Sequence, residues 1–249
     1  MFGFEDPKLI RYHSVIAYDG SNYSGWQSQK NNDNCIQKRI ENGLKIIFKK
    51  EIKVFAAGRT DKGVHAHGQS IHFDTHLSIN PERLLYALNK ILTPDIKFIK
   101  INIVSDCFHA RHSALSKTYE YVIKLTELNV FESRFKVYVK NFNINLAKEA
   151  ACKFIGTYDF QYFAKIDDHR PTIKTIYNIE FILEPNELKI VFHGNGFLKY
   201  MVRRMVGAII MVATQKVTLK FIDECFLGSN KKSVITAKPN GLYLVKVDY

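Results

Sequence analysis

The sequence lacks closely spaced cysteines. Its cysteines stand far apart and form no CxxC or Cys/His ligand pattern, so neither a disulfide framework nor a zinc module is expected. A reducing cytoplasm fits this usage. The residues concerned are Cys35, Cys107, Cys152 and Cys225.

Long apolar runs and nucleotide-binding fingerprints are also missing. No stretch of about 18 uninterrupted apolar residues occurs, and the start, MFGFEDPKLIRYH, has no charged region followed by an apolar one. We therefore expect a soluble, unprocessed cytoplasmic protein without a membrane partner. There is also no P-loop or dinucleotide-binding fingerprint, which agrees with a protein that needs no cofactor. The 46% of hydrophobic residues suffice for a sizeable core.

What the chain does have is basic charge. Lys and Arg outnumber Asp and Glu by 36 to 24, which gives a net charge of +12. Such an excess suits a polyanionic partner, and nucleic acid is the first candidate. The alternative is a solvated lysine-rich surface, so the charge has to be joined to a site before it indicates a function.

Hydrophobic periodicity predicts strands and helices along the whole chain. Segment 9–18 is β-rich and ends at a turn signal, Asp19-Gly20. From Asn34, an expected N-cap, apolar residues recur at i+3 or i+4 as in an amphipathic helix. Further expected elements are strands over 52–57 and 69–75, a helix over 80–92, strands over 96–104 and 118–125, a helix from Asn145 to Gly156, a hairpin of 172–183 and 187–194, a helix over 197–214 and a strand over 241–249.

This order of elements predicts an α+β fold with two lobes rather than a doubly wound parallel fold. We expect mixed or antiparallel sheets that form a central sheet flanked by helices. The polar stretch SDCFHARHSALSK, from Ser105, is the expected crossing between the halves. It places the lobes at residues 1–107 and 108–249.

The stretch GRTDKGVHAHGQ, from Gly58, is dense in glycine and polar groups although it lies between apolar strands. Its glycines permit tight bends and close approach of a ligand. Arg59 and Lys62 flank Asp61, and nearby cations favour the ionised carboxylate that a nucleophile or base requires. The alternatives are that Asp61 caps its own turn, as most loop aspartates do, or forms a surface ion pair with Arg59.

The histidines in and after this stretch suggest a metal site only weakly. His65, His67 and His72 have no cysteine beside them and no carboxylate placed as a third ligand. We therefore expect no metal and interpret them as surface or RNA-contacting histidines.

Together with five other blocks in order, the run AGRTDKGVHAHGQ resembles the tRNA pseudouridine synthase A family. The resemblance spans nearly the whole chain. The other blocks are YDGSNYSGWQ from Tyr18, FHARHSALSKTYEY from Phe108, GTYDFQYF from Gly156, GFLKYMVRRMVG from Gly196 and GLYLVKVDY from Gly241.

The resemblance implies roles for individual residues. Asp61 matches the catalytic aspartate, and Tyr119 matches the tyrosine that stacks on the target base. Arg203 matches the arginine that pairs with the aspartate, and Arg59 an arginine thought to help extrude the base. The first lobe would then carry the Arg-Thr-Asp loop and the second the tyrosine strand and the arginine helix, with the catalytic cleft between them.

The resemblance also implies a substrate and a partner. The family isomerises uridines at positions 38–40 of the tRNA anticodon stem-loop, without a cofactor, as a homodimer. The detached uracil has to leave its stack and turn, which requires base flipping. Whether the carboxylate adds to base or sugar or abstracts a proton stays open. Also open are a synthase that acts on another tRNA position or on ribosomal RNA, and a non-catalytic RNA-binding protein.

Some of these residues have ordinary structural alternatives. Tyr119 could be one more core tyrosine, and Arg203 could lie on a solvated helix face. One stripe of the helix over 197–214 is assigned to the core. Residues 164–170 depart from the Ser-Phe-Arg sequence that the family commonly has after GTYDFQYF, which puts RNA contacts there in doubt. The stripe consists of Phe197, Met201, Met205, Ala208 and Val212.

Overall fold

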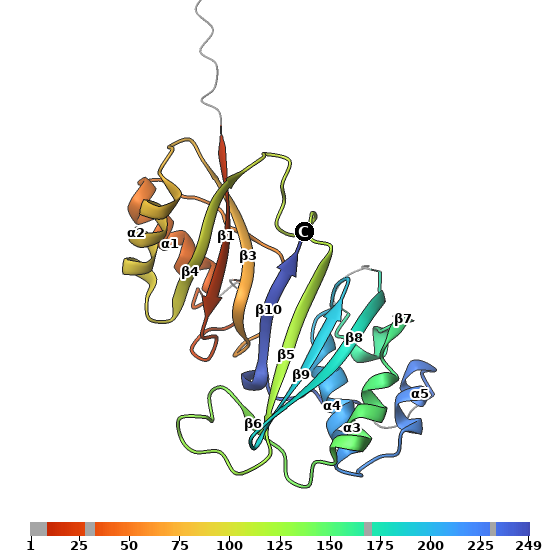
Figure 1. Ribbon diagram of the computed structural model, residues 1–249. Coiled ribbons are helices and arrows are strands. Elements are labelled where there is room, and N and C mark those ends of the chain that lie inside the picture. Colours follow the sequence, from red (N-terminus) through yellow and green to blue (C-terminus); the bar gives the residue numbers. More distant parts are fainter. Residues whose placement is uncertain (1–8, 28–32, 167–170, 230–232) are drawn as a thin grey trace, which may run out of the picture. The chain divides into compact units, whose positions relative to one another are not determined.

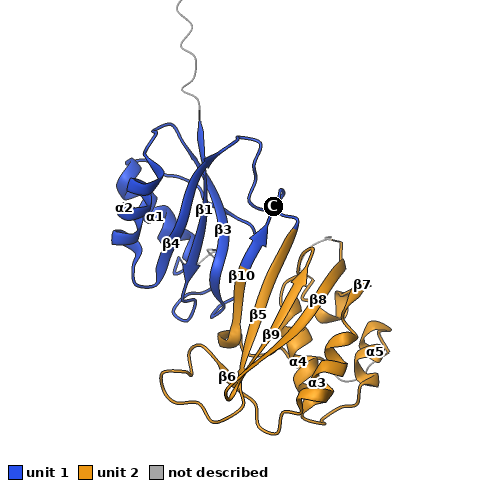
Figure 2. Ribbon diagram, viewed as in Figure 1, with its two compact units in different colours: residues 1–115, 246–249 blue, residues 116–245 orange. Residues whose placement is uncertain are grey.

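The computed structural model describes residues 9–27, 33–166, 171–229 and 233–249. The chain forms two compact units (Figures 1 and 2): unit 1 comprises Met1–Leu115 and Lys246–Tyr249, and unit 2 comprises Ser116–Val245. Each unit combines a sheet with helices, which confirms the predicted α+β class. The units divide after Leu115 rather than after residue 107, and the end of the chain belongs to unit 1.

Unit 1 is an antiparallel sheet covered by helices. Its strands run in the order β4-β1-β3, with β2 paired to β3. Figure 1 shows α1 and α2 together on one side of this sheet. The bounds are β1 Ile10–Tyr18, α1 Ile36–Phe48, β2 Phe55–Ala56, β3 His65–Thr75, α2 Pro81–Leu92 and β4 Ile96–Val104.

The core of unit 1 follows from simple periodicities. Alternate residues of β1, from Tyr12 to Tyr18, are buried, as expected of a strand with one covered face. In α2, Leu84, Leu88 and Leu92 recur at i+4 and are buried. These burials confirm the strand predicted over 9–18 and the helix over 80–92.

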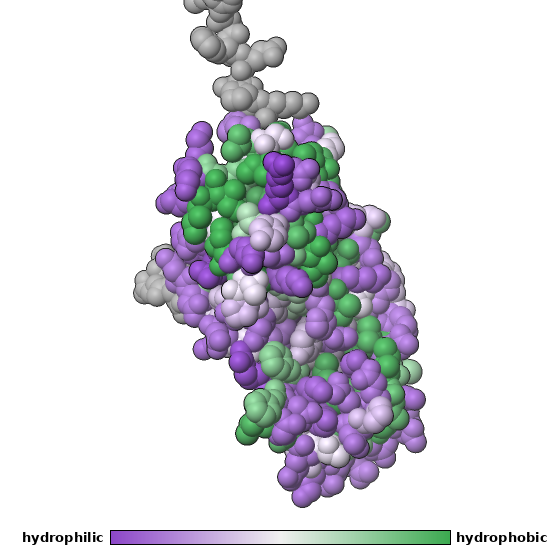
Figure 3. Space-filling model, turned by 60° about the vertical axis from the view of Figure 1, so that its left-hand side comes forward, coloured by the Kyte–Doolittle hydropathy of each residue, from purple (hydrophilic) through white to green (hydrophobic). Residues whose placement is uncertain are grey.

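Hydrophobic side chains are also exposed on unit 1. Figure 3 shows hydrophobic residues (green) gathered on the face of unit 1 in the upper part of that view. Ile99 and Ile103 of the edge strand β4 are about half exposed. Lys97 and Lys100 of the same strand are exposed as well, and lysines on an edge discourage pairing with another chain.

Three predictions for unit 1 are wrong in detail. Helix α1 is capped by Cys35, whose Sγ accepts from Lys38 N at 3.4 Å, and not by Asn34. Of the strand predicted over 52–57, only Phe55–Ala56 forms a strand, β2. Strand β3 begins at His65 rather than at Gln69, because the pairing with β1 continues to Ala66 opposite Tyr18.

Unit 2 likewise combines antiparallel strands with helices. The order is β5-β9-β8-β7, and β6 lies parallel to β5. Strand β10 begins in this unit at Leu242. The bounds are β5 Ser116–Lys124, β6 Val137–Tyr138, α3 Ile144–Cys152, β7 Gly156–Asp159, β8 Ile173–Glu184, β9 Glu187–Gly194, α4 Met201–Ala213, α5 Lys220–Phe226 and β10 Leu242–Asp248.

The hairpin predicted around Pro185-Asn186 is confirmed, and Asn186 adopts the left-handed conformation at its turn with φ 61°. Helix α3 is capped by Asn143, whose Oδ1 accepts from Asn145 N and Leu146 N, so the cap predicted at Asn145 is wrong. That helix also ends before Gly156, which begins β7.

Helix α4 is shorter than predicted. It starts at Met201 rather than near Phe197, because Tyr200 has φ 63° and interrupts the helical backbone. The predicted core stripe is confirmed within it, since Met201, Met205, Ala208 and Val212 are buried. In the departing segment 164–170, residues 167–170 lie outside the described residues.

Gly207 lets α4 pack directly against the segment before β10. A Cβ at Gly207 would lie 1.9 Å from Ile235 O, and a backbone atom cannot move aside as a flexible side chain can. We expect Gly207→Ala to lower the free energy of unfolding by about 1–3 kcal/mol. Urea unfolding measures this.

The matched control is Gly196→Ala, where the nearest heavy atom to the new Cβ is Lys174 Cδ at 4.0 Å. We expect this variant to stay within about 0.5 kcal/mol of the parent chain. Equal stabilities for the two variants would contradict the close packing of α4.

Candidate functional site

The loop 57–64 in unit 1 carries the Arg-Thr-Asp motif and is braced by segment 18–26. Trp26 N donates to Thr60 O at 3.0 Å. The hydroxyls of Tyr18 and Thr60 share a hydrogen bond of 2.8 Å, and Gln69 Nε2 donates to Gly58 O at 2.7 Å. The start and the middle of the loop are therefore attached to the sheet or to the segment that follows β1.

Two glycines of segment 18–26 make this brace sterically possible. A Cβ at Gly20 would lie 2.0 Å from Val64 O. Gly25 has φ +106°, and a Cβ there would lie 2.9 Å from Thr60 O. Two sequence blocks that are separated along the chain thus fit against each other through their backbones.

Asp61 lies at the turn of this loop. Its main-chain oxygen accepts from Val64 N at 3.1 Å, and Gly63 supplies the positive φ of 77° that the turn needs. Asp61 is half-buried, whereas Arg59 and Lys62 are exposed. The loop therefore presents one carboxylate residue between two cations on a backbone that is held in place.

Tyr18 is the buried anchor of the brace. Burial raises the pKa of its phenol to about 12, and the hydrogen bonds from Thr60 and Gln69 oppose that rise. The hydroxyl is therefore neutral at physiological pH and serves as a hydrogen-bonding group. It links Thr60 to Gln69 Nε2, which lies 3.4 Å away.

The interpretation of the histidines as surface groups is correct for one of the three. His67 is exposed, but His65 and His72 are buried, because β3 begins at His65 and takes both into the sheet. His65 Nδ1 accepts from Gly20 N at 3.1 Å and lies 3.2 Å from Asp19 Oδ1. Among the described residues, no group of three or more His, Cys, Asp or Glu could hold a metal ion.

His72 belongs to an aromatic and histidine cluster on β1, β2 and β3. Its ring stacks on Phe55 with centroids 5.0 Å apart, and its Nδ1 accepts from Ala110 N at 3.1 Å. Burial, together with the charges of His109 and Arg11, lowers the pKa of His72 to about 4. The imidazole is therefore neutral and acts as a structural acceptor for the segment that follows β4 in unit 1.

In unit 2, Tyr119 lies on β5 opposite Phe192 of β9. Only 7% of Tyr119 is exposed, and its ring meets Phe197 edge-on with centroids 5.1 Å apart. This packing resembles that of a core tyrosine, the alternative weighed for it from the sequence. Its role in stacking on a base stays a prediction.

Arg203 is held by the segment that leads into β10. Its Nε donates to Ala237 O at 2.8 Å, and Ala237 N donates to Arg203 O at 3.0 Å. The guanidinium also lies 5.2 Å from the ring centroid of Tyr200, within cation–π range. Burial raises the pKa of the Tyr121 phenol, and the positive charge of Arg203 opposes that rise. The pairing of Arg203 with Asp61 stays a prediction.

The neighbouring arginine has a different environment. Arg204 Nη1 donates to Ala164 O at 2.6 Å, so this side chain ties α4 to the end of the short 3-10 helix 161–163. The two consecutive arginines are thus distinguished by the structure, which the sequence alone could do only through the MVRxxVG block.

Sequence reasoning missed the residues that hold the candidate groups. Tyr18 and Trp26 brace the loop, and Tyr200 underlies Arg203. Tyr18 and Trp26 belong to the block YDGSNYSGWQ, and membership of that block was the signal in the sequence that could have pointed to them. Nothing in the sequence indicates the positive φ of Tyr200, since tyrosine rarely adopts it.

Comparison with known proteins adds to this geometry. The sequence profile of the family described as tRNA pseudouridine synthase matches residues 15–113 and 150–249. A tRNA pseudouridine synthase A of Listeria monocytogenes serovar 1/2a is 40% identical over 97% of this chain and 100% of its own length. Similar proteins of the same name occur in Phytoplasma mali, at 40% identity over 97% and 100%, and in Aster yellows witches'-broom phytoplasma, at 37% over 96% and 98%.

Removal of the Tyr18 hydroxyl tests the brace. We expect Tyr18→Phe to lower the free energy of unfolding by about 1–2 kcal/mol, because Thr60 Oγ1 loses its buried partner. Exchange of the Trp26 amide, which donates to Thr60 O, should also become faster in hydrogen-exchange measurements. Tyr86→Phe, at an exposed tyrosine of α2, is the control and should change neither; unchanged exchange in Tyr18→Phe would count against the brace.

The lowered pKa of His72 predicts a pH-dependent stability. Between its ordinary value of 6.5 and about 4, the unfolded chain binds the proton and the folded chain does not. The free energy of unfolding should therefore fall by about 1–3 kcal/mol as the pH drops through this range. His13 and His109, whose pKa values burial also lowers, contribute with the same sign.

The variant His72→Asn keeps an acceptor for Ala110 N and removes the titrating ring. Urea unfolding at several pH values should give it a shallower slope than the parent chain. His67→Asn, at the exposed histidine of the same strand, should keep the parent slope. A slope that is the same in all three proteins would show that His72 is not its source.

Proposed function

The chain belongs to the tRNA pseudouridine synthase family and isomerises uridine to pseudouridine in tRNA, and we propose that Asp61 is its catalytic carboxylate. The reaction breaks the bond between N1 of the base and the sugar and rejoins the sugar to C5. A proton leaves C5 and N1 gains one, so no electrons are exchanged with a partner. A carboxylate that adds to the base or sugar, or moves a proton, can serve such a reaction.

The braced loop is the observation that carries this proposal. Catalytic groups need a fixed position relative to the substrate, and loop 57–64 is fixed by backbone contacts with Gly20 and Gly25 as well as by Thr60. Asp61 stays partly exposed on this fixed backbone. A carboxylate that only capped its own turn would not require a second segment to hold the turn.

We further propose that Arg59, Tyr119 and Arg203 bind the substrate. Arg59 is exposed beside Asp61 and is suited to a phosphate or to the gap that a flipped base leaves. Tyr119 provides an aromatic ring beside Phe197. To stack on the flipped uracil, this buried ring would have to become more exposed. Arg203 has a guanidinium oriented by Ala237 and Tyr200.

The substrate position and the assembly are also part of the proposal. We infer that the targets are the uridines of the anticodon stem-loop at positions 38–40, that the enzyme works in the cytoplasm and that it acts as a homodimer. Full-length similarity to proteins named tRNA pseudouridine synthase A supports these inferences. Among the described residues, no helix is long and apolar enough to cross a membrane.

The catalytic role of Asp61 is tested by Asp61→Asn, which keeps the size of the side chain and removes its charge. We expect turnover of unmodified tRNA to fall by at least about 10²- to 10⁴-fold, while tRNA affinity stays within about threefold, because phosphate contacts dominate affinity. Mapping of pseudouridine on the product measures both the rate and the position.

The matched control is Asp106→Asn, at an exposed aspartate of the same unit, and it should retain full turnover. Activity in Asp61→Asn equal to that of the control would contradict the catalytic role. Wild-type product at another tRNA position or in ribosomal RNA would keep the chemistry and replace the substrate assignment. Wild-type binding without any product would favour an RNA-binding protein.

A further inference from the structure

The loop between β5 and β6 in unit 2 exposes two apolar side chains at its tip. Val130 is 79% exposed and Phe131 is 84% exposed. The residues around them are polar or charged, including the exposed Glu127, Ser133 and Arg134. The ring of Phe131 covers no core and is accessible to a partner.

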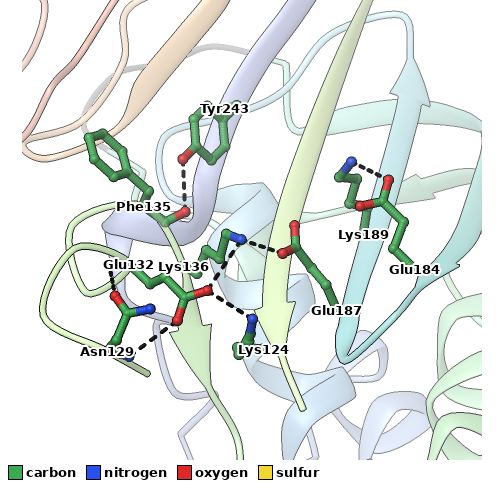
Figure 4. Close-up of polar contacts among 9 residues, drawn as sticks. All are labelled: Lys124, Asn129, Glu132, Phe135, Lys136, Glu184, Glu187, Lys189 and Tyr243. Atoms are coloured by element: carbon green, nitrogen blue, oxygen red, sulfur yellow. Dashed lines mark hydrogen bonds and ion pairs between the residues drawn. The ribbon is translucent and has the colours of Figure 1, made fainter. Parts of the chain in front are cut away.

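The tip is held by its own turn. Asn129 Oδ1 accepts from Phe131 N at 2.9 Å and from Glu132 N at 3.1 Å. The carboxylate of Glu132 in turn accepts from Asn129 N at 3.1 Å and pairs with Lys124 of β5 at 2.8 Å (Figure 4). Phe131 is thus presented by a side-chain network rather than by a loose connection.

The other end of the loop is attached to the rest of unit 2. Lys136 pairs with Glu187, and Tyr243 Oη donates to Phe135 O at 2.7 Å (Figure 4). Asn240 Nδ2 donates to Ser133 O and to Lys136 O, each at 2.8 Å. These bonds reduce the conformational entropy that a partner would otherwise have to overcome on binding.

The loop shares its support with a proposed substrate-binding residue. Asn240 follows closely after Ala237, which makes hydrogen bonds in both directions with Arg203. Between them, Lys238 O accepts from Tyr121 Oη at 2.8 Å. Segment 237–240 therefore joins the base of the loop to the surroundings of Arg203 and β5.

We propose that Phe131 stacks on an unpaired nucleobase of the tRNA other than the reacting uridine, and that Arg134 contacts a neighbouring phosphate. The inference rests on the proposed function, since it names a further contact of that enzyme with its substrate. An exposed aromatic ring with an arginine nearby is the usual pair for single-stranded nucleic acid, and Arg134 is exposed shortly after Phe131 on the same loop.

Charge and size both favour RNA over a protein partner at this tip. The chain carries +12, which attracts a polyanion. Specific protein interfaces bury about 800 Å² on each partner, whereas the tip offers Val130 and Phe131 among polar neighbours. One flat base matches one exposed ring.

The test compares Phe131→Ala, Phe131→Leu and Phe131→Trp in the full chain with unmodified tRNA as the probe. Loss of one stacked base should weaken binding by about 5- to 150-fold in Phe131→Ala. KM should rise with kcat unchanged, because the contact is the same in the ground state and the transition state. Phe131→Leu should resemble Phe131→Ala, and Phe131→Trp should retain affinity.

Two further variants complete the design. Arg134→Gln should reduce the slope of log affinity against log salt by about 0.7–0.9, the value for one phosphate contact. Leu227→Ala, at another strongly exposed apolar residue of unit 2, should leave KM and affinity unchanged.

Distinct results would overturn the proposal. If Phe131→Leu keeps full affinity, the contact is apolar and not a stack, and if Phe131→Ala changes only the sedimentation of the protein, the tip binds a second copy. Unchanged KM and affinity in Phe131→Ala would also reject it. Wild-type turnover, measured first on the same tRNA, separates these results from a failure of the proposed function, which would leave no product in any variant.

Discussion

The pairing of β1 with β3 is the constraint on which the candidate site depends. The strands run antiparallel from Ile10 opposite Thr75 to Tyr18 opposite Ala66, so the end of β1 lies beside the start of β3. The loop that precedes β3 therefore emerges next to the segment that follows β1. Tyr18, the last residue of β1, reaches Thr60 within the loop. The register of the β1–β3 pair therefore fixes the position of the loop, and the loop in turn fixes where Asp61 lies.

Unit 2 positions Arg203 in a comparable way, but with a helix in place of a strand. Gly207 allows α4 to approach the main chain of Ile235, and one turn earlier Arg203 bonds Ala237 through both its side chain and its backbone. The guanidinium is thus oriented by main-chain groups, which do not change rotamer. In both units a glycine allows two backbone segments to approach closely, and hydrogen bonds near this approach then hold a polar residue in one orientation.

The sequence was sufficient for the α+β class and for most elements, because their periodicity is strong. Alternation in β1, the i+4 leucines of α2 and the turn at Pro185-Asn186 are local signals. The errors arise where tertiary contacts override them. The side chain of Asn34 donates to Asn22 O at 2.7 Å and Cys35 caps α1 in its place, and His65 joins β3 because β1 offers a partner as far as Tyr18.

The same distinction applies to the candidate site. Asp61 and Arg59 could be named from the motif, since residue type and spacing carry that information. The brace by Tyr18 and Trp26 depends on which segments meet in three dimensions, and the contact between Tyr200 and Arg203 depends on a positive φ that the residue type disfavours. Tyr119 could be named, yet its burial against Phe197 follows from packing alone.

The excess of positive charge gains a structural meaning from the ion pairs. Many of the fewer acidic residues pair within a unit, as Asp74 does with Arg11, Glu132 with Lys124 and Glu187 with Lys136. Each of these carboxylates is neutralised by the cation with which it pairs. The other Lys and Arg side chains therefore determine the electrostatic potential that a nucleic acid encounters. Affinity for tRNA then depends on charges spread over the surface and falls with salt, whereas the proposed mechanism makes turnover depend on Asp61, whose position the β1–β3 register fixes. The proposal thus assigns binding and catalysis to different residues of the same chain.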